Sequence, residues 1–144
     1  LAAFSRQWFD YSEGQMRAAI GALPAGRAMR TSRHDAMPGT PDAGLTLGAE
    51  VRVDPLNRLI QVDLRANPDC LPSGLNVSEA CARTAAMIGV FNSLDHTVPR
   101  NAGSFRRIEV KLRENCVVGI PRHPASCSVA KGSAPSTRTI PARR

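Results

Sequence analysis

Residues 51–53 and 60–64 alternate between apolar and polar side chains, and the turn sequence Asp54-Pro55-Leu56-Asn57 separates them. Alternation with a period of two is typical of a half-buried β-strand, and Asp, Pro and Asn favour turns. The sequence therefore predicts a β-hairpin, and any fold of this chain has to accommodate it.

Two helices are predicted on either side of this hairpin. Residues 4–23 place apolar side chains at mostly three- and four-residue spacings, and proline and glycine residues end the segment. Residues 75–94 are rich in alanine and keep their larger apolar residues near one face. Either Asn76 or Ser78 can cap this second helix, and Glu79 lies near the positive end of its dipole.

The remaining segments are shorter and less regular. Residues 27–35 form a polar stretch, and residues 37–44 are a loop rich in Pro and Gly. Residues 105–112 predict a strand with one charged face, and the apolar run 116–120 is a candidate partner strand. The predicted fold class is α+β: an N-terminal amphipathic helix, a β-hairpin, a long alanine-rich helix, short strands, and a flexible basic tail over residues 131–144.

Length and charge limit the classes of function. The chain has 144 residues, enough for one compact domain or one piece of a larger one. It carries 19 Lys and Arg against 12 Asp and Glu, and the net charge of +7 permits contact with polyanions. Aromatic residues make up only 4 %, which leaves no stacking platform for single strands, so nucleic acid is not expected as a partner. No apolar run is long enough to span a membrane and no secretion signal is evident, so the expected location is the cytoplasm.

Residues that carry metal or nucleophilic chemistry are scattered along the chain. The histidines and cysteines lie on separate segments and lack the spacing of zinc ligands: His34, His96, His123, Cys70, Cys81, Cys116 and Cys127. We therefore predict no metal site and expect free, buried thiols. No serine lies in a G-x-S-x-G elbow, and no glycine-rich phosphate-binding loop occurs.

Two polar clusters remain as candidates for a binding site. Asn76 at a helix start, with Arg83 two turns further on, could hold an anionic or carbonyl group; the alternative is a plain helix cap with a surface arginine. Asn101 and Gly103 belong to the second cluster, and its alternative interpretation is a turn that leads into a strand. Neither cluster identifies a reaction unaided.

Two long strings, VDLRANPDCLPSGLNVSEACARTAAMIGVFNSL and VPRNAGSFRRIEVKLRENCVVGIPRHPASCSVA, occur in this order and closely resemble the hydantoinase B/oxoprolinase family. The helix YSEGQMRAAIGALPAGR resembles the family's upstream helix, so the resemblance covers residues 11–130. Asn76 stands at the end of the family's Gly-Pro-x-Asn turn and Arg83 at the arginine of its following helix. Asn101 and Gly103 match its Asn-x-Gly turn. The resemblance implies scaffold or substrate-cleft positions for these four residues, and we assign no catalytic residue.

The family includes the B-type subunit of N-methylhydantoinases, the corresponding half of 5-oxoprolinase and the large subunit of acetone-carboxylase-like enzymes. The resemblance implies an ATP-dependent enzyme that opens a cyclic amide (a hydantoin, a lactam or 5-oxoproline) or carboxylates a ketone. The carbonyl oxygen would be phosphorylated first, and this chain would line a cleft shared with partner chains. ATP and a divalent metal are implied for the whole complex, with the nucleotide site on a hydantoinase-A-type subunit and no cofactor bound by this chain.

Family subunits are several times longer, and the N-terminal half that carries their His/Asp segment has no counterpart here. We therefore expect a C-terminal-half fragment, inactive alone, in which residues 1–130 form a partial hydantoinase-B-type domain. Residues 131–144 would be a basic tail unrelated to the family. The expected partners are the A-type subunit and the missing N-terminal part of the B-type subunit. A second hypothesis, a non-catalytic assembly subunit, predicts a large apolar patch on the 82–91 face of the alanine-rich helix.

Overall fold

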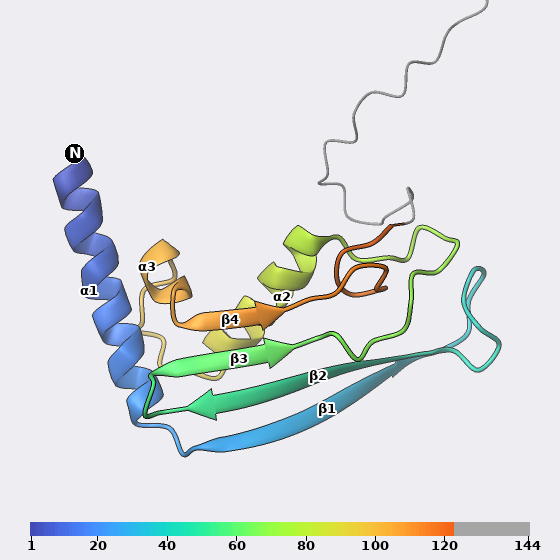
Figure 1. Cartoon of the computed structure of the whole chain (residues 1–144), viewed down its shortest axis with the longest axis horizontal. Coiled ribbons are helices and arrows are strands. Elements are labelled where there is room, and N and C mark those ends of the chain that lie inside the picture. The colour runs from blue at the N-terminus through green and yellow to red at the C-terminus, as the bar shows by residue number, and fades with distance from the viewer. Residues whose placement is uncertain (123–144) are drawn as a thin grey trace, which may run out of the picture.

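A computed structural model gives the fold of residues 1–122, and it confirms the α+β class. The predicted basic tail lies outside these described residues. In chain order the elements are α1 (Ala2–Gly21), β1 (Gly26–His34), β2 (Leu45–Asp54), β3 (Leu59–Asp63), α2 (Glu79–Asn92), α3 (Ala102–Phe105) and β4 (Ile108–Lys111) (Figure 1).

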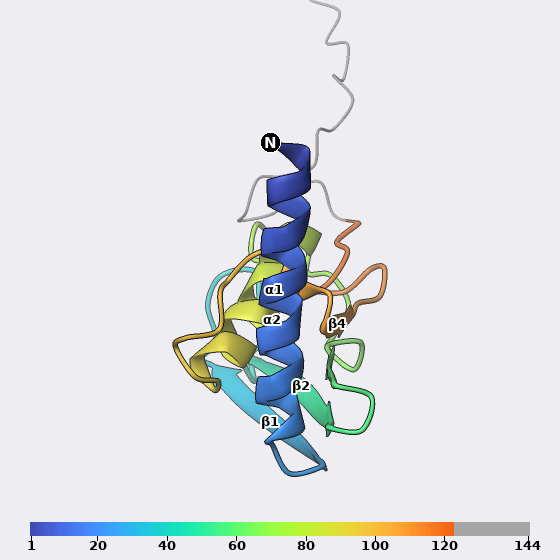
Figure 2. The ribbon, with the colours of Figure 1, turned by 90° about the vertical axis from the view of Figure 1, so that its left-hand side faces the viewer.

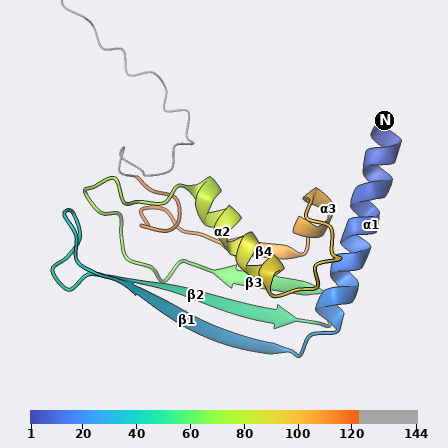
Figure 3. The ribbon, with the colours of Figure 1, turned by 180° about the vertical axis from the view of Figure 1, so that it is seen from behind.

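The four strands form one mixed sheet in the order β1-β2-β3-β4. The pairs β1–β2 and β2–β3 are antiparallel, whereas β3 and β4 are parallel. Parallel neighbours need a long crossover connection, and here α2 and α3 lie within it. Helix α2 lies on one face of the sheet, seen from that side in Figure 3, and the opposite face carries no helix of the described chain. Helix α1 stands across one end of the sheet (Figure 2).

The predicted β-hairpin is confirmed as β2 and β3. Val53 pairs with Ile60 and Val51 with Val62, so the alternating apolar residues of both strands share one face. The Asp54 side chain closes the turn. Ile60 and Val62 are buried beneath α2, which explains why the alternation is so clear in the sequence.

No strand was predicted for the polar stretch 27–35, and the structure corrects this, because most of the stretch forms the nine-residue strand β1. It pairs with β2 from Gly26↔Val53 to His34↔Leu45. All nine residues are exposed, and β1 is an edge strand. An edge strand with no buried face carries no apolar alternation, so the period-two signal is missing.

The two predicted helices exist with shifted limits. Helix α2 begins at Glu79, and its cap is Ser78, whose Oγ accepts the Cys81 N–H. The residues before Ser78 form a loop, which shortens the helix expected over 75–94. Helix α1 buries Ser12, Met16 and Ile20 on one face. In its N-terminal half the side chains of Phe4, Trp8 and Tyr11 are exposed.

The strand predicted over 105–112 is divided. Its first residue, Phe105, is the last residue of the short helix α3. Asn101 caps the start of that helix, and Ser104 completes a capping box. Only Ile108–Lys111 forms β4. The candidate strand 116–120 is not a strand, because the backbone turns back on itself: Asn115 has a left-handed φ of 53°, and its N–H donates to the Ile120 carbonyl.

Candidate functional site

Asn76, the first predicted site residue, is fully buried inside the loop that precedes α2. Its Oδ1 accepts the Leu71 N–H at 2.8 Å, and its Nδ2 donates to the carbonyls of Leu71 at 2.8 Å and Ser73 at 2.9 Å. One side-chain amide thus satisfies both backbone groups of Leu71. Asn76 is held in the loop rather than at the first turn of the helix.

Arg83 connects α2 to the sheet. Its guanidinium pairs with Glu79 one turn earlier at 3.0 Å and donates to the Val110 carbonyl of β4 at 3.2 Å. The side chain is partly exposed. Arg83 is therefore a surface arginine with a packing role, and its charge still faces solvent on one side.

Asn101 and Gly103 join α3 to α1. The Asn101 Nδ2 donates to the Ser12 Oγ at 2.7 Å, and its Oδ1 accepts the Gly103 N–H at 2.8 Å. A Cβ on Gly103 would lie 2.0 Å from the Phe9 carbonyl oxygen, so only glycine allows the two helices to approach this closely. These two residues lie at the α1–α3 contact, whereas Asn76 and Arg83 lie near the start of α2. The structure thus places the four candidates at two different junctions.

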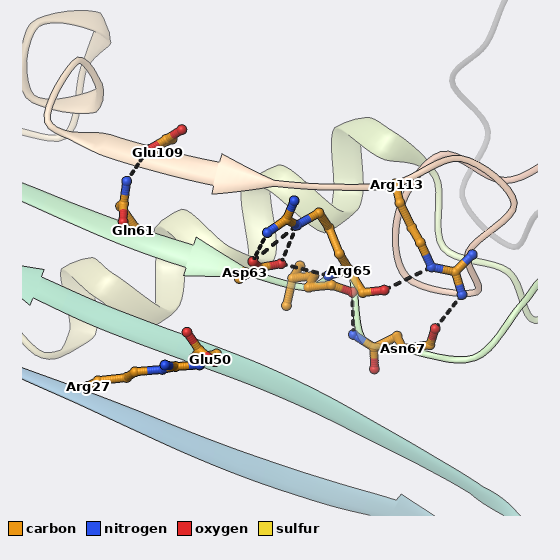
Figure 4. Close-up of polar contacts among 9 residues, drawn as sticks. Arg27, Glu50, Gln61, Asp63, Arg65, Asn67, Glu109 and Arg113 are labelled. Carbon is orange, nitrogen blue, oxygen red and sulfur yellow. Dashed lines mark hydrogen bonds and ion pairs between the residues drawn. The ribbon is translucent and has the colours of Figure 1, made fainter.

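A second buried asparagine, Asn67, was not predicted as a functional residue. Its Oδ1 accepts the Gly48 N–H at 2.7 Å, and its Nδ2 donates to the carbonyls of Gly48 and Leu64, each at 2.8 Å. Arg113 donates to the Asn67 carbonyl at 2.6 Å and to the Arg65 carbonyl at 2.8 Å (Figure 4). We call Asn67, Asn76 and Arg113 the loop clamp, because together they fix the segments that flank β3 and β4. In the sequence Asn67 stands in the polar turn Asn67-Pro68-Asp69, and turn residues of this kind do not separate a buried amide from an exposed one.

The cysteines of the described chain are free, as expected, but their burial differs. Cys116 is fully buried beside the loop clamp, Cys70 is partly exposed and Cys81 is exposed. Burial raises the pKa of the Cys116 thiol, so it stays protonated and is a poor nucleophile. Cys127 lies outside the described residues.

The helix-free face of the sheet is polar and holds an open cavity of about 820 Å³. Figure 4 shows its polar contacts, and the pairs are Arg27 with Glu50, Asp63 with Arg65, and Gln61 with Glu109.

Two carboxylates of this face, Glu50 and Asp63, are directly opposed on neighbouring strands. Like charges in that position repel, and arginines on either side offset the repulsion. The hydrogen bond from Arg65 lowers the pKa of Asp63 despite partial burial. The Asp63 carboxylate therefore stays ionised near neutral pH. It is suited to accept hydrogen bonds and not to act as a general acid.

The helix-covered face holds a groove of about 440 Å³ between α2 and strands β2 and β3. We call it the apolar groove, because Ser93 is its only residue with a polar side chain. Its lining is Leu23, Ala49, Val51, Val53, Ile60, Val62, Leu64, Ala82, Ala85, Ala86, Gly89, Val90, Ser93, Leu94 and Val118.

Residues 1–122 offer no metal site. No three His, Cys, Asp or Glu side chains there are grouped to hold a metal ion, so this part of the chain does not fit the divalent metal implied for the family. No helix in the same range is long and apolar enough to cross a membrane.

Comparison with known proteins identifies the class to which this fold and sequence belong. The model of the hydantoinase B/oxoprolinase family matches residues 1–140. The chain therefore belongs to the hydantoinase B/oxoprolinase family.

One solved structure has a similar fold. The fold is similar to the crystal structure of the ATP-dependent caprolactamase from Pseudomonas jessenii, with a TM-score of 0.70 and 17 % sequence identity. The match covers 84 % of this chain but only 20 % of the caprolactamase chain. No curated protein sequence matches this chain.

Proposed function

We propose that this chain is a segment of an ATP-dependent enzyme of the hydantoinase B/oxoprolinase type that acts on cyclic amides or carboxylates a ketone. The observation that supports this most is the family match over residues 1–140. The fold shared with an ATP-dependent caprolactamase agrees with it and favours the cyclic amides.

In this proposal the chain supplies part of the wall of a cleft that partner chains complete. Arg83 is the candidate donor to a substrate carbonyl or phosphate oxygen, because its guanidinium is partly exposed. Asn76, Asn101 and Gly103 are positioning residues, because their polar atoms bond to the chain's own backbone and side chains. A donor held in place, as the Arg83 guanidinium is by Glu79 and the Val110 carbonyl, favours charge that develops in a transition state. ATP and the divalent metal would be held by the complex and not by residues 1–122.

A non-catalytic assembly role is the second candidate, and one observation favours it. The assembly hypothesis predicts exposed apolar surface on the 82–91 face of α2. Ile88 is half exposed there, and Ala85 and Gly89 border the apolar groove. Large exposed apolar patches mark interaction sites in soluble proteins.

Co-expression with a hydantoinase-A-type chain and a B-type polypeptide that supplies the N-terminal half would test both roles. Steady-state ATP hydrolysis should be followed with hydantoins, lactams and ketones in turn. We expect a stable complex whose ATPase rate rises with one substrate class and falls at least tenfold in Arg83→Ala. Arg122→Ala, which removes an exposed arginine from a surface ion pair, is the matched control.

The outcomes separate the two roles. A complex that forms and turns over, with Arg83→Ala as active as the parent, would favour the assembly role. A chain that binds neither partner would contradict both.

A further inference from the structure

We propose that the apolar groove receives an amphipathic helix from the rest of a longer hydantoinase-B-type polypeptide. This inference rests on the proposed function for the identity of that polypeptide. It names an interaction surface and the segment that covers it.

The groove has the shape of a binding site for a helix. The inward faces of β2 and β3 form its floor, and α2 forms one wall. Figure 3 shows α2 above β3 and β4, while no helix stands beside it above β1. At Ala49, Leu64 and Val118 the groove continues into a second hollow of about 320 Å³ that reaches Arg30 on β1. A helix laid parallel to α2 would complete a second layer on this half of the sheet.

The chemistry of the lining favours a helix over other occupants. An extended segment in the groove would bury its backbone N–H and C=O groups against side chains of which only Ser93 can form a hydrogen bond. A cyclic amide would face the same shortage of partners for its own N–H and C=O. A helix satisfies its backbone groups internally and presents only side chains.

The wall formed by α2 permits close approach of a second helix. It is built mainly of small residues, and Ala85 and Gly89 are exposed in the described chain. A Cβ placed on Gly89 would meet nothing within 4 Å. Small residues allow helix axes to approach to the lower end of the usual range of about 8–10 Å.

Charge at the β1 side defines the partner further. Arg30 pairs with Ala49 across the strands, so it lies on the groove face; it donates only to the Met29 carbonyl and forms no ion pair with a carboxylate of residues 1–122. The incoming helix should therefore carry Asp or Glu on the edge that faces β1. The match to only 20 % of the caprolactamase chain indicates that relatives contain ample further polypeptide to supply such a helix.

Photo-crosslinking in the assembled complex tests the occupant. A benzoylphenylalanine replaces Ser93, an exposed residue at the border of the groove, in one sample and Gly14 in the control. Gly14 is an exposed helical glycine of α1 with open space at its Cβ position. We expect position 93 to link to a B-type segment with apolar residues at i, i+3, i+4 and i+7 and acidic residues beside them. Position 14 should not link to that segment. A link from position 93 to the A-type chain, to a second copy, or to residues 123–144, or no link at all, would overturn the proposal.

Gly89→Phe and Gly14→Phe give an independent measurement, because both glycines are exposed and a Cβ at either position meets nothing within 4 Å. We expect Gly89→Phe to weaken association with the B-type polypeptide by roughly tenfold or more and Gly14→Phe to leave it unchanged. Circular dichroism confirms that both variants fold. A raised KM for substrate with unchanged assembly would instead make the groove a ligand site.

The inference and the proposed function can fail separately. If the complex hydrolyses ATP in response to substrate but Gly89→Phe assembles normally, only the inference fails. If assembly depends on position 89 but no substrate stimulates ATP hydrolysis, only the proposed function fails.

Discussion

The loop clamp and the apolar groove lie close together along the same sheet, yet they differ in how far the chain completes them. In the loop clamp, the amides of Asn67 and Asn76 are buried and form hydrogen bonds through both their oxygen and their nitrogen to the chain's own backbone. In the groove, apolar side chains of β2 and α2 remain open to solvent. The comparison shows that the chain satisfies its own buried polar groups in the loop clamp but leaves apolar side chains exposed in the groove.

Asn76→Ala, in the loop clamp, should cause the largest loss of stability among the variants considered. It removes the partners of the Leu71 N–H and of the Leu71 and Ser73 carbonyls in a buried loop. We expect a loss of about 4 kcal/mol in the free energy of unfolding, since each buried unsatisfied group costs about 1–3 kcal/mol. Urea denaturation measures it. Asn57→Ala, at an exposed turn, is the control and should cost under about 1 kcal/mol. Equal effects of the two variants would contradict the role given to the loop clamp.

Two methionines sharpen the contrast between packed and open regions. Met16 in α1 is 0 % exposed, whereas Met29 in β1 is 53 % exposed. Met16→Ala should lower the free energy of unfolding by about 3 kcal/mol through a cavity in the core. Met29→Ala should change it by no more than about 0.5 kcal/mol. Thermal and urea unfolding of the isolated chain are the measurements, and a large loss for Met29→Ala would mean that β1 is covered in solution.

Gly103→Ala tests the close packing between α1 and α3. The new methyl group would press on the backbone of Phe9, which cannot move aside like a flexible side chain. We expect a loss of about 2 kcal/mol in the free energy of unfolding. Hydrogen exchange should then show faster opening of α1. Gly74→Ala, where the added Cβ meets nothing within 4 Å, should be neutral, and matching losses would refute the close-approach argument.

The smallest expected effect concerns pH. The hydrogen bond from Arg106 lowers the pKa of Glu13, and Arg107 contributes. A carboxyl whose pKa is lower in the folded state stabilises it above the unfolded pKa, and this stability is lost as pH falls through the folded pKa. Glu13→Gln should therefore cost about 1 kcal/mol at pH 7 and almost nothing at pH 2. Urea midpoints at both pH values check this. Equal losses at pH 7 and pH 2 would contradict the role given to the ionised Glu13 carboxylate.

Local patterns predicted the parts of the fold that local forces determine. The hairpin was clear because one face of each strand is buried, and the alanine-rich helix was found because its apolar face packs on the sheet. Strand β1 was missed because its residues bury nothing and are held only by pairing with β2. Asn76 and Ser78 were equal candidates for the helix cap, since only the fold-back of residues 71–73 decides between them.

The candidate site was harder to predict than the fold. The sequence marked Asn101 as a turn residue, but its bond to Ser12 spans 89 positions, and no local pattern carries that information. Arg113 directly follows the charged strand predicted over residues 105–112, and its guanidinium donates to backbone carbonyls of two separate segments. Contacts of this kind depend on the finished topology.

The junction of α1 with α3 also bears on the order in which the molecule assembles. Contacts between residues far apart in the chain need the closure of a long loop, which is slower than forming a hairpin. The strands β1, β2 and β3 follow one another in the chain, whereas Asn101 reaches Ser12 across 89 positions. The antiparallel strands should therefore pair before α3 docks on α1.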